Sequence, residues 1–321
     1  MVVKNLISFK HLFLLVPFIF LLGCEKEIEL DLGDFQPHIV INTLFEGGSK
    51  WNVHVCKSNN VLDPQTVNTN LPRALVYITD VTLGHKYQLY HQRDGNFTNS
   101  GEIIQHGHKY RIDVSHPGYE SVNAEAIVPL PIEVELLHSE TLQFNGKLAL
   151  KVDFEISDDP TADNYYIYEI LNLIPNLPND LSEVPFLDSP IKNWLSSVDG
   201  NTGYINDSSE KQSKLFITDQ NFRGSVLNTS LVSFVEIQEG GSVNNPQLPT
   251  DVQYVPDFTQ SRLKVIGASQ EMYEYYKSVE LMIQKEALNS SVSIPVKPYS
   301  NIENGLGIFA GFTEIVINIQ Q

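Results

Sequence analysis

The chain has 321 residues and a formal net charge of −18 at pH 7, and 42% of its residues are hydrophobic while 19% are charged. This apolar content is enough for a packed interior, which excludes global disorder. Because the charge is strongly negative and no stripe of Lys or Arg offsets it, a nucleic-acid-binding surface is also excluded. The length suggests about two domains.

The N-terminus has the features of a bacterial lipoprotein signal peptide. Its first residues include lysines and no acid, and residues 12–22 form an apolar run that is too short to span a bilayer. The run ends in Leu21-Leu22-Gly23-Cys24, the spacing of a lipobox, in which the cysteine is acylated before cleavage. We therefore expect residues 1–23 to be removed and Cys24 to carry the acyl chains of a stable membrane anchor. An ordinary secretory signal that ends near a cysteine is the alternative.

A charged segment follows this cysteine directly. Glu25, Lys26 and Glu27 open an acidic tether over residues 24–36, and a lysine followed by acids resembles the signal that sends Bacteroidetes lipoproteins to the outer leaflet of the outer membrane. We therefore expect a lipid-anchored protein of the outer membrane that faces the cell surface. A merely solvated tether is the alternative, and it would leave the protein in the periplasm.

From residue 38 to residue 128 the sequence alternates apolar and polar residues with a period of two, which is typical of strands. The segments are residues 38–45, 51–58, 74–80, 85–92, 109–116 and 120–128, and glycine-containing turns such as Asp94-Gly95 separate them. This spacing predicts an N-terminal β-sandwich over residues 37–130. Cys56 lies in the second segment and is interpreted as a half-exposed strand thiol, because no base is placed near it in sequence.

The two prolines of Val128-Pro129-Leu130-Pro131 favour an extended connector, so we place a domain boundary there and assign residues 131–321 to a second, larger domain. This domain opens with a hairpin whose second strand covers residues 147–157. A two-residue turn would set Leu148 opposite Gln143 and bury the wrong face. The hydrophobic phase therefore predicts a three-residue loop that sets Leu148 opposite Leu142.

The rest of this domain is predicted to combine strands with one helix. Strand candidates are residues 164–174, 215–220, 225–235, 262–268 and 312–319. The helix is expected over residues 270–287, after Ser269 as N-cap, with Tyr and Met residues at helical spacing that form a packing face against one sheet. The sequence thus predicts an all-β fold of two β-sandwich domains of immunoglobulin or fibronectin type, the second with one amphipathic helix and long loops.

Residues 175–210 are predicted to form a long loop without regular structure. Its first part is rich in proline and keeps large apolar side chains, namely Leu177, Leu181, Val184, Phe186 and Leu187. We expect these five residues to form a partner-docking surface, because prolines lower the entropy of the free loop and apolar side chains can serve as anchors. Folding back of the same side chains as a local core is the alternative.

The sequence contains only weak candidates for metal-binding or catalytic motifs. His106-Gly107-His108 lacks a clear third metal ligand, and the acidic loop over residues 158–164 could hold calcium but has no EF-hand glycine or terminal Glu. Nucleophile-elbow, HEXXH, P-loop and Rossmann motifs are missing. We therefore expect no catalytic residues, no metal and no cofactor. A hydrolase with dispersed carboxylates is the least favoured alternative.

Four segments together resemble the Bacteroidetes lipoprotein family known as domain of unknown function 4249. They are CEKEIELDL, PHIVINTLFEGG, SQEMYEYYKSVELM and SNIENGLGIFAGF, and within the last of them residues 301–307 are the most specific piece. Members of that family are typically encoded near TonB-dependent outer-membrane receptors. The resemblance therefore implies a non-enzymatic accessory or ligand-handling role beside an outer-membrane β-barrel, with no catalytic residues to transfer. A structural, adhesion or surface-assembly subunit is the alternative function.

Overall fold

The computed structural model describes residues 35–60, 68–144, 147–173, 191–197, 214–237, 257–287 and 297–319. The chain divides into a unit of residues 1–36 and a unit of residues 37–321. All helices and strands described below belong to the second unit. Among the described residues no helix is long and apolar enough to cross a membrane.

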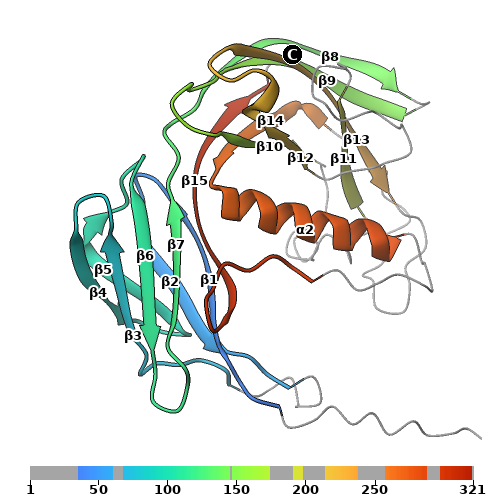
Figure 1. Ribbon diagram of the computed structural model, residues 1–321. Coiled ribbons are helices and arrows are strands. Elements are labelled where there is room, and N and C mark those ends of the chain that lie inside the picture. The colour runs from blue at the N-terminus through green and yellow to red at the C-terminus, as the bar shows by residue number, and fades with distance from the viewer. Residues whose placement is uncertain are drawn as a thin grey trace, which may run out of the picture. The chain divides into compact units, whose positions relative to one another are not determined.

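The first part of this unit consists of seven strands, which Figure 1 shows in blue to green. They are β1 (Ile39–Glu46), β2 (Lys50–Lys57), β3 (Leu75–Asp80), β4 (His85–His91), β5 (Asn96–Ile103), β6 (Lys109–Ser115) and β7 (Val122–Ile127). All six predicted segments are confirmed as strands. β5 was not predicted, because its sequence NFTNSGEI is polar and only Phe97 is buried.

Among its described residues, the second part contains eight strands, one short helical turn and one longer helix. They are β8 (Glu133–Phe144), β9 (Lys147–Ser157), β10 (Tyr165–Leu173), β11 (Ile191–Ser197), β12 (Leu215–Thr218), the short helix η3 (Asp219–Asn221), β13 (Val226–Ile237), β14 (Asp257–Ala268), α2 (Gln270–Ala287) and β15 (Leu306–Asn318). The all-β class is therefore confirmed. The prediction that residues 175–210 lack regular structure is wrong for β11.

The described strands form two sheets. The larger sheet combines strands that precede the connector at residues 128–131 with strands that follow it. Eleven strands follow the order β12-β10-β14-β15-β1-β2-β5-β4-β3-β6-β7, and four others follow the order β11-β13-β9-β8. β15 joins the two parts, because it pairs in parallel with β1 and antiparallel with β14. The predicted division into two immunoglobulin-type sandwiches is not confirmed by this single large sheet.

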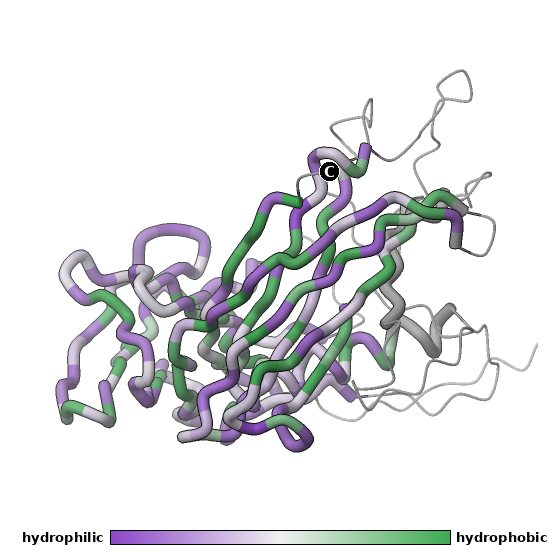
Figure 2. The backbone as a smooth tube through the Cα atoms, turned by 90° about the horizontal axis from the view of Figure 1, so that it is seen from above, coloured by the Kyte–Doolittle hydropathy of each residue, from purple (hydrophilic) through white to green (hydrophobic). Residues whose placement is uncertain are grey.

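Three buried clusters hold these layers together. The first fills the space enclosed by β1 to β7 around Trp51, whose ring stacks on Phe309 of β15. The second joins the four-stranded sheet to β10, β12 and β14 through residues such as Phe154 and Tyr168. Figure 2 shows the alternation of hydrophobic and hydrophilic residues along the strands that makes this packing possible.

The third cluster lies beneath α2, where Met272 and Tyr273 pack on Ile167, Phe216 and Ile266. The prediction that a helix covers one sheet is confirmed, and so is its N-terminus. The backbone N–H of Met272 donates to Ser269 Oγ at 3.3 Å, which satisfies one of the free donors of the first helical turn.

The hairpin of β8 and β9 corrects the predicted register. Phe144 pairs with Lys147 and Gln143 with Leu148, so the three-residue loop is wrong. The phase is restored inside β8 by a bulge between Leu136 and His138, after which Leu136 faces Phe154. Leu137, the extra residue, is half exposed. One inserted residue in β8, rather than the length of the turn, therefore brings the apolar side chains of β8 and β9 to the same face of the sheet.

Residues 301–307, the most specific piece of the family resemblance, clamp β7 to β15. The Asn301 amide N–H donates to the carbonyl oxygens of Glu125 (3.2 Å) and Phe309 (2.7 Å), and its Oδ1 accepts from the Phe309 N–H at 3.0 Å. Gly307 has a φ of +99° and lies against the backbone of Ile41. This segment therefore has a structural role.

Candidate functional site

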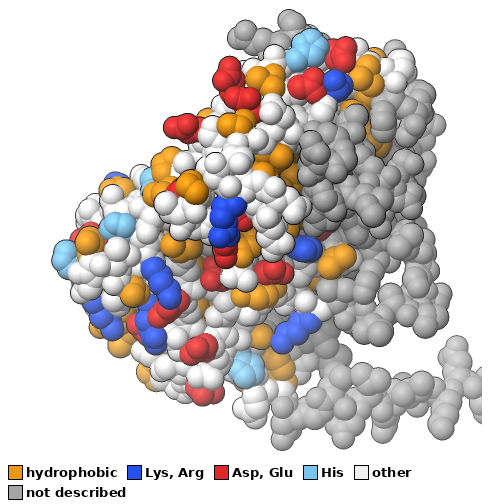
Figure 3. Space-filling model, turned by 45° about the horizontal axis from the view of Figure 1, so that its top comes forward, with side chains coloured by type: hydrophobic (Ala, Val, Ile, Leu, Met, Phe, Trp, Pro, Cys, Tyr) orange, Lys and Arg blue, Asp and Glu red, His pale blue; other side chains and the backbone are white. Residues whose placement is uncertain are grey.

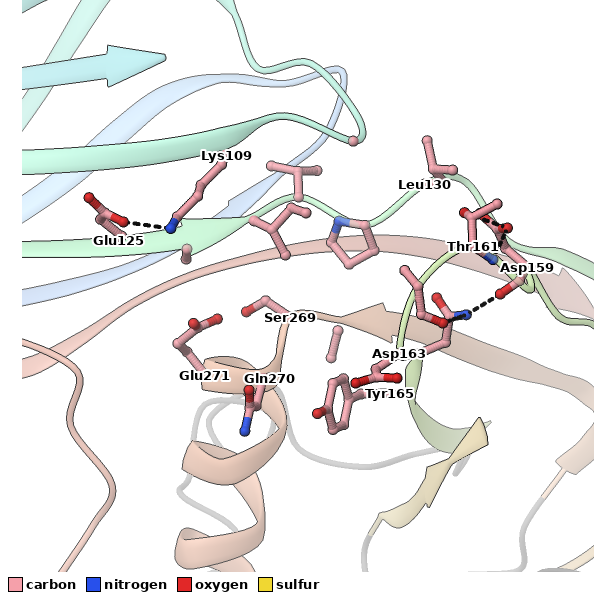
Figure 4. Close-up of a pocket in the computed structure, with 18 residues that line it drawn as sticks. Lys109, Glu125, Leu130, Asp159, Thr161, Asp163, Tyr165, Ser269, Gln270 and Glu271 are labelled. Atoms are coloured by element: carbon pink, nitrogen blue, oxygen red, sulfur yellow. Dashed lines mark hydrogen bonds and ion pairs between the residues drawn. The ribbon is translucent and has the colours of Figure 1, made fainter. Parts of the chain in front are cut away.

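A pocket of about 580 Å³ lies where four segments meet (Figure 4). Lys109 of β6 and residues 125–130, which run from β7 into the connector, form one wall. The loop over residues 159–164 with Tyr165 forms a second wall, and Ala268 to Glu271, at the start of α2, complete the lining. Pockets at the junction of two parts of a fold are common sites of ligand binding.

The β6–β7 wall carries a charged pair. Lys109 Nζ lies 2.6 Å from Glu125 Oε2, and Arg111 Nη1 lies 3.6 Å from Glu125 Oε1. The hydrogen bond from Lys109 holds the pKa of Glu125 below its ordinary value. Figure 3 shows such neighbouring basic and acidic side chains on the surface. Glu125 therefore stays ionised at neutral pH.

Carboxylates of the acidic loop are already engaged by the protein itself. Asp158 accepts from the Tyr166 hydroxyl at 2.6 Å and from the Gly224 N–H at 2.7 Å. Asp163 forms an ion pair with Arg223. Within the described part of the chain, no group of three or more His, Cys, Asp or Glu side chains is arranged to hold a metal ion. These contacts give the calcium hypothesis for residues 158–164 no support.

Asp159 contributes a carboxylate to the pocket. Its Oδ1 accepts from the Thr161 N–H at 2.9 Å and from the Thr161 hydroxyl at 2.7 Å. The bond from the hydroxyl and the bond from the N–H lower the pKa of Asp159. This carboxylate is therefore also charged at neutral pH.

Both polar and apolar groups line the rest of the pocket. Gln270 and Glu271 belong to the first turn of α2, where a carboxylate is favoured by the helix dipole. Burial raises the pKa of Tyr165, so its phenol keeps its proton and can donate a hydrogen bond. Ile127 and Leu130 line the pocket although 45% and 50% of their surfaces are exposed. Such a combination suits an amphipathic ligand.

The two histidines that were considered as a metal site, His106 and His108, contact different partners. His106 packs against Gly47, and its Nδ1 lies 3.3 Å from the Pro129 carbonyl oxygen. His108 Nδ1 lies instead 2.8 Å from Asp80 Oδ2. Each ring thus has its own structural partner. Cys56 is partly buried, and burial raises the pKa of its thiol, which disfavours the reactive thiolate.

The residues predicted from sequence to be functional lie elsewhere in the chain. Cys24, Glu25, Lys26 and Glu27 fall outside the described residues, and so do Leu177, Leu181, Val184, Phe186 and Leu187. The pocket itself was not predicted. Its residues come from four separate segments, and only the acidic loop and Ser269 gave any signal.

The fold defines an all-β protein with an eleven-stranded and a four-stranded sheet and a covering helix. This chain belongs to the family described as Domain of unknown function (DUF4249), whose sequence profile matches residues 25–316. A comparison with curated proteins finds no significant match.

Two solved structures show distant similarity. An alpha-2-macroglobulin from Salmonella, reacted with methylamine, is 9% identical with a TM-score of 0.19, and the match covers 88% of this chain but 16% of that one. A manganese lipoxygenase of Gaeumannomyces graminis, solved with part of a zonadhesin of Komagataella pastoris, is 12% identical with a TM-score of 0.17, covering 72% of this chain and 88% of that one. Neither overlap supports an argument about fold or function.

Proposed function

We propose that the protein is a lipid-anchored protein of the outer membrane that faces the cell surface. In this role it is a non-enzymatic, ligand-handling accessory of a TonB-dependent transporter or another outer-membrane β-barrel. The observation that carries the proposal is the lipobox ending at Cys24, followed by a short acidic tether and a folded unit that starts at Pro37. At about 3.5 Å per residue, such a tether reaches at most roughly 45 Å, which keeps the folded unit beside neighbouring membrane proteins.

Ligand handling is supported by the pocket between β6–β7 and α2. Its carboxylates Glu125 and Asp159 have lowered pKa values, so they remain charged at neutral pH. A fixed charge suits recognition of a ligand, whereas a general acid or base needs a pKa near the operating pH. We therefore favour binding over catalysis at this site.

The finer architecture is part of this proposal. The buried cluster within β1 to β7 and the cluster beneath the four-stranded sheet would form the interiors of two sandwich-like modules that share β15. The expected boundary between them stays at residues 130 and 131. Such modules would present separate surfaces to a ligand and to a barrel partner.

Affinity purification from cells in mild detergent, with mass spectrometry, tests the partnership. We expect the protein to co-purify with an outer-membrane β-barrel. Replacing Leu177, Leu181 and Phe186 by Ser should abolish this co-purification at unchanged thermal stability. A lowered melting temperature with the partner retained would show that these side chains form a local core instead.

A matched control separates docking from general loss of apolar surface. Leu83, Val226 and Leu281 are exposed at 57%, 51% and 45%, and their replacement by Ser removes three apolar side chains of similar size. We expect the barrel to co-purify with this control. Recovery of filament or matrix components in place of a barrel would favour the structural role, and substrate turnover lost on mutating an acid would favour a hydrolase.

A further inference from the structure

The charge of the pocket is unbalanced. Four carboxylates, those of Glu125, Asp159, Asp163 and Glu271, line it together with a single ammonium group, that of Lys109. Glu125 is compensated by Lys109, and Asp163 is compensated by Arg223. Asp159 and Glu271 have no Lys, Arg or His within ion-pair distance among the residues that the structure describes. The pocket therefore offers two uncompensated negative charges.

These two carboxylates share the pocket with large apolar side chains. In Figure 4 Glu271 lies at the start of α2 on one side of the pocket, and Asp159 lies on the other side, below Leu130. Leu130 and Ile127 are large apolar side chains with about half of their surface exposed. Exposed apolar surface inside a polar pocket is unfavourable unless a ligand covers it.

We propose that this pocket binds an alkylammonium ligand, with its ammonium group at Asp159 or Glu271 and its methylene chain against Ile127 and Leu130. Charge complementarity favours a cation, because a negatively charged ligand would meet the two uncompensated carboxylates of Asp159 and Glu271. The apolar side chains of Ile127 and Leu130 favour a ligand with an alkyl chain, because contact with them removes its methylene groups from water. A metal ion fits less well, since no group of three His, Cys, Asp or Glu side chains among the described residues is arranged to hold one.

This inference rests on the proposed ligand-handling function and names its ligand class. Two sources share the chemistry, a free polyamine and the lysine side chain of a peptide. The purified full-length protein in mild detergent is titrated calorimetrically at low ionic strength with cadaverine, with its uncharged analogue pentanediol and with an acetylated, amidated lysine tripeptide. We expect heat of binding from at least one of the two cationic probes and none from pentanediol. Binding of cadaverine alone identifies a free amine as the source, and binding of the tripeptide alone identifies a peptide.

Variants then locate the site. Glu271→Gln and Asp159→Asn each remove one uncompensated charge, and we expect each to weaken binding about fivefold to tenfold. Glu120→Gln makes the same change of charge at an exposed residue outside the pocket, and it should leave binding unchanged. Thermal melts of all three variants verify that they are folded.

Three results would overturn the inference. They are no heat from either cationic probe, equal heat from pentanediol, and equal weakening by Glu120→Gln and the two pocket variants. The test is independent of the membrane, so it can fail while the protein is found on the cell surface with a barrel partner. It can equally succeed when localisation and partnership fail.

Discussion

Replacing Gly307 by Ala should weaken the junction between β1 and β15 far more than its size suggests. Gly307 pairs with Ile41 in the parallel ladder and has a φ of +99°, a conformation that residues with a Cβ rarely adopt. An added Cβ would lie 2.0 Å from the Ile41 carbonyl oxygen and 2.8 Å from Asn42 Oδ1. Because the nearest atom belongs to the backbone, the two strands must move apart.

The expected loss has two parts. The strained backbone costs on the order of 1 to 2 kcal/mol. Forced separation of packed strands adds about 1 to 3 kcal/mol, as for other overpacked sites. We therefore expect a loss of unfolding free energy on the order of 2 to 5 kcal/mol.

Gly118→Ala is the matched control. Gly118 has a similar φ of +90°, but nothing lies within 4 Å of the added Cβ. Its loss should be confined to the backbone strain, on the order of 1 to 2 kcal/mol. Equilibrium urea denaturation gives both values from the midpoint and slope. Equal losses for the two variants would refute the conclusion that β1 and β15 approach too closely for a side chain.

Further predictions concern the N-terminus and the pH dependence of stability. Cys24→Ala should leave an unprocessed precursor, and unchanged metabolic palmitate labelling of that variant would contradict the lipobox. Replacing residues 25–27 by Ala should abolish protease accessibility on intact cells at unchanged protein level, whereas equal cleavage of variant and wild type would remove the export argument. The pKa of Glu125 is lowered by Lys109, so its contribution to stability is present at neutral pH. It is lost as the pH falls from the ordinary pKa of a glutamate through the lower folded-state value. Glu125→Gln should flatten that part of the acid denaturation curve, and an unchanged curve would show that the pair contributes nothing.

Local patterns predicted most elements of this fold. Alternation with a period of two located the strands of the first part, and helical spacing after Ser269 located α2 at the residues where it occurs. β5 escaped detection because a polar strand at a half-exposed face has no such alternation. β11 escaped because it lies in a stretch in which proline and irregular spacing dominate.

Long-range features could not be predicted in the same way. The phase of the β8–β9 hairpin was assigned to its turn, whereas a bulge at Leu137 corrects it, and a single inserted residue leaves no signal in an apolar run. The parallel pairing of β1 with β15 joins segments near opposite ends of the described sequence, so no local pattern can report it. For the same reason Glu125 and Glu271 look like isolated surface acids in the sequence, and only the fold brings them into one pocket with Asp159.

β15 is the last described strand in the sequence, yet it completes the pairing of β1, the first. During synthesis the strands β1 to β7 emerge first. β1 then lacks its second partner, and Phe45 lacks the ring of Phe309 at 4.4 Å, until the last described strand has emerged. Until then the edge of β1 is open to pairing with other chains, and closing so long a loop is slow. We therefore expect the nascent protein to depend on holding chaperones. We also expect a chain that stops before β15 to be degraded or to aggregate rather than to persist as a half-sized domain.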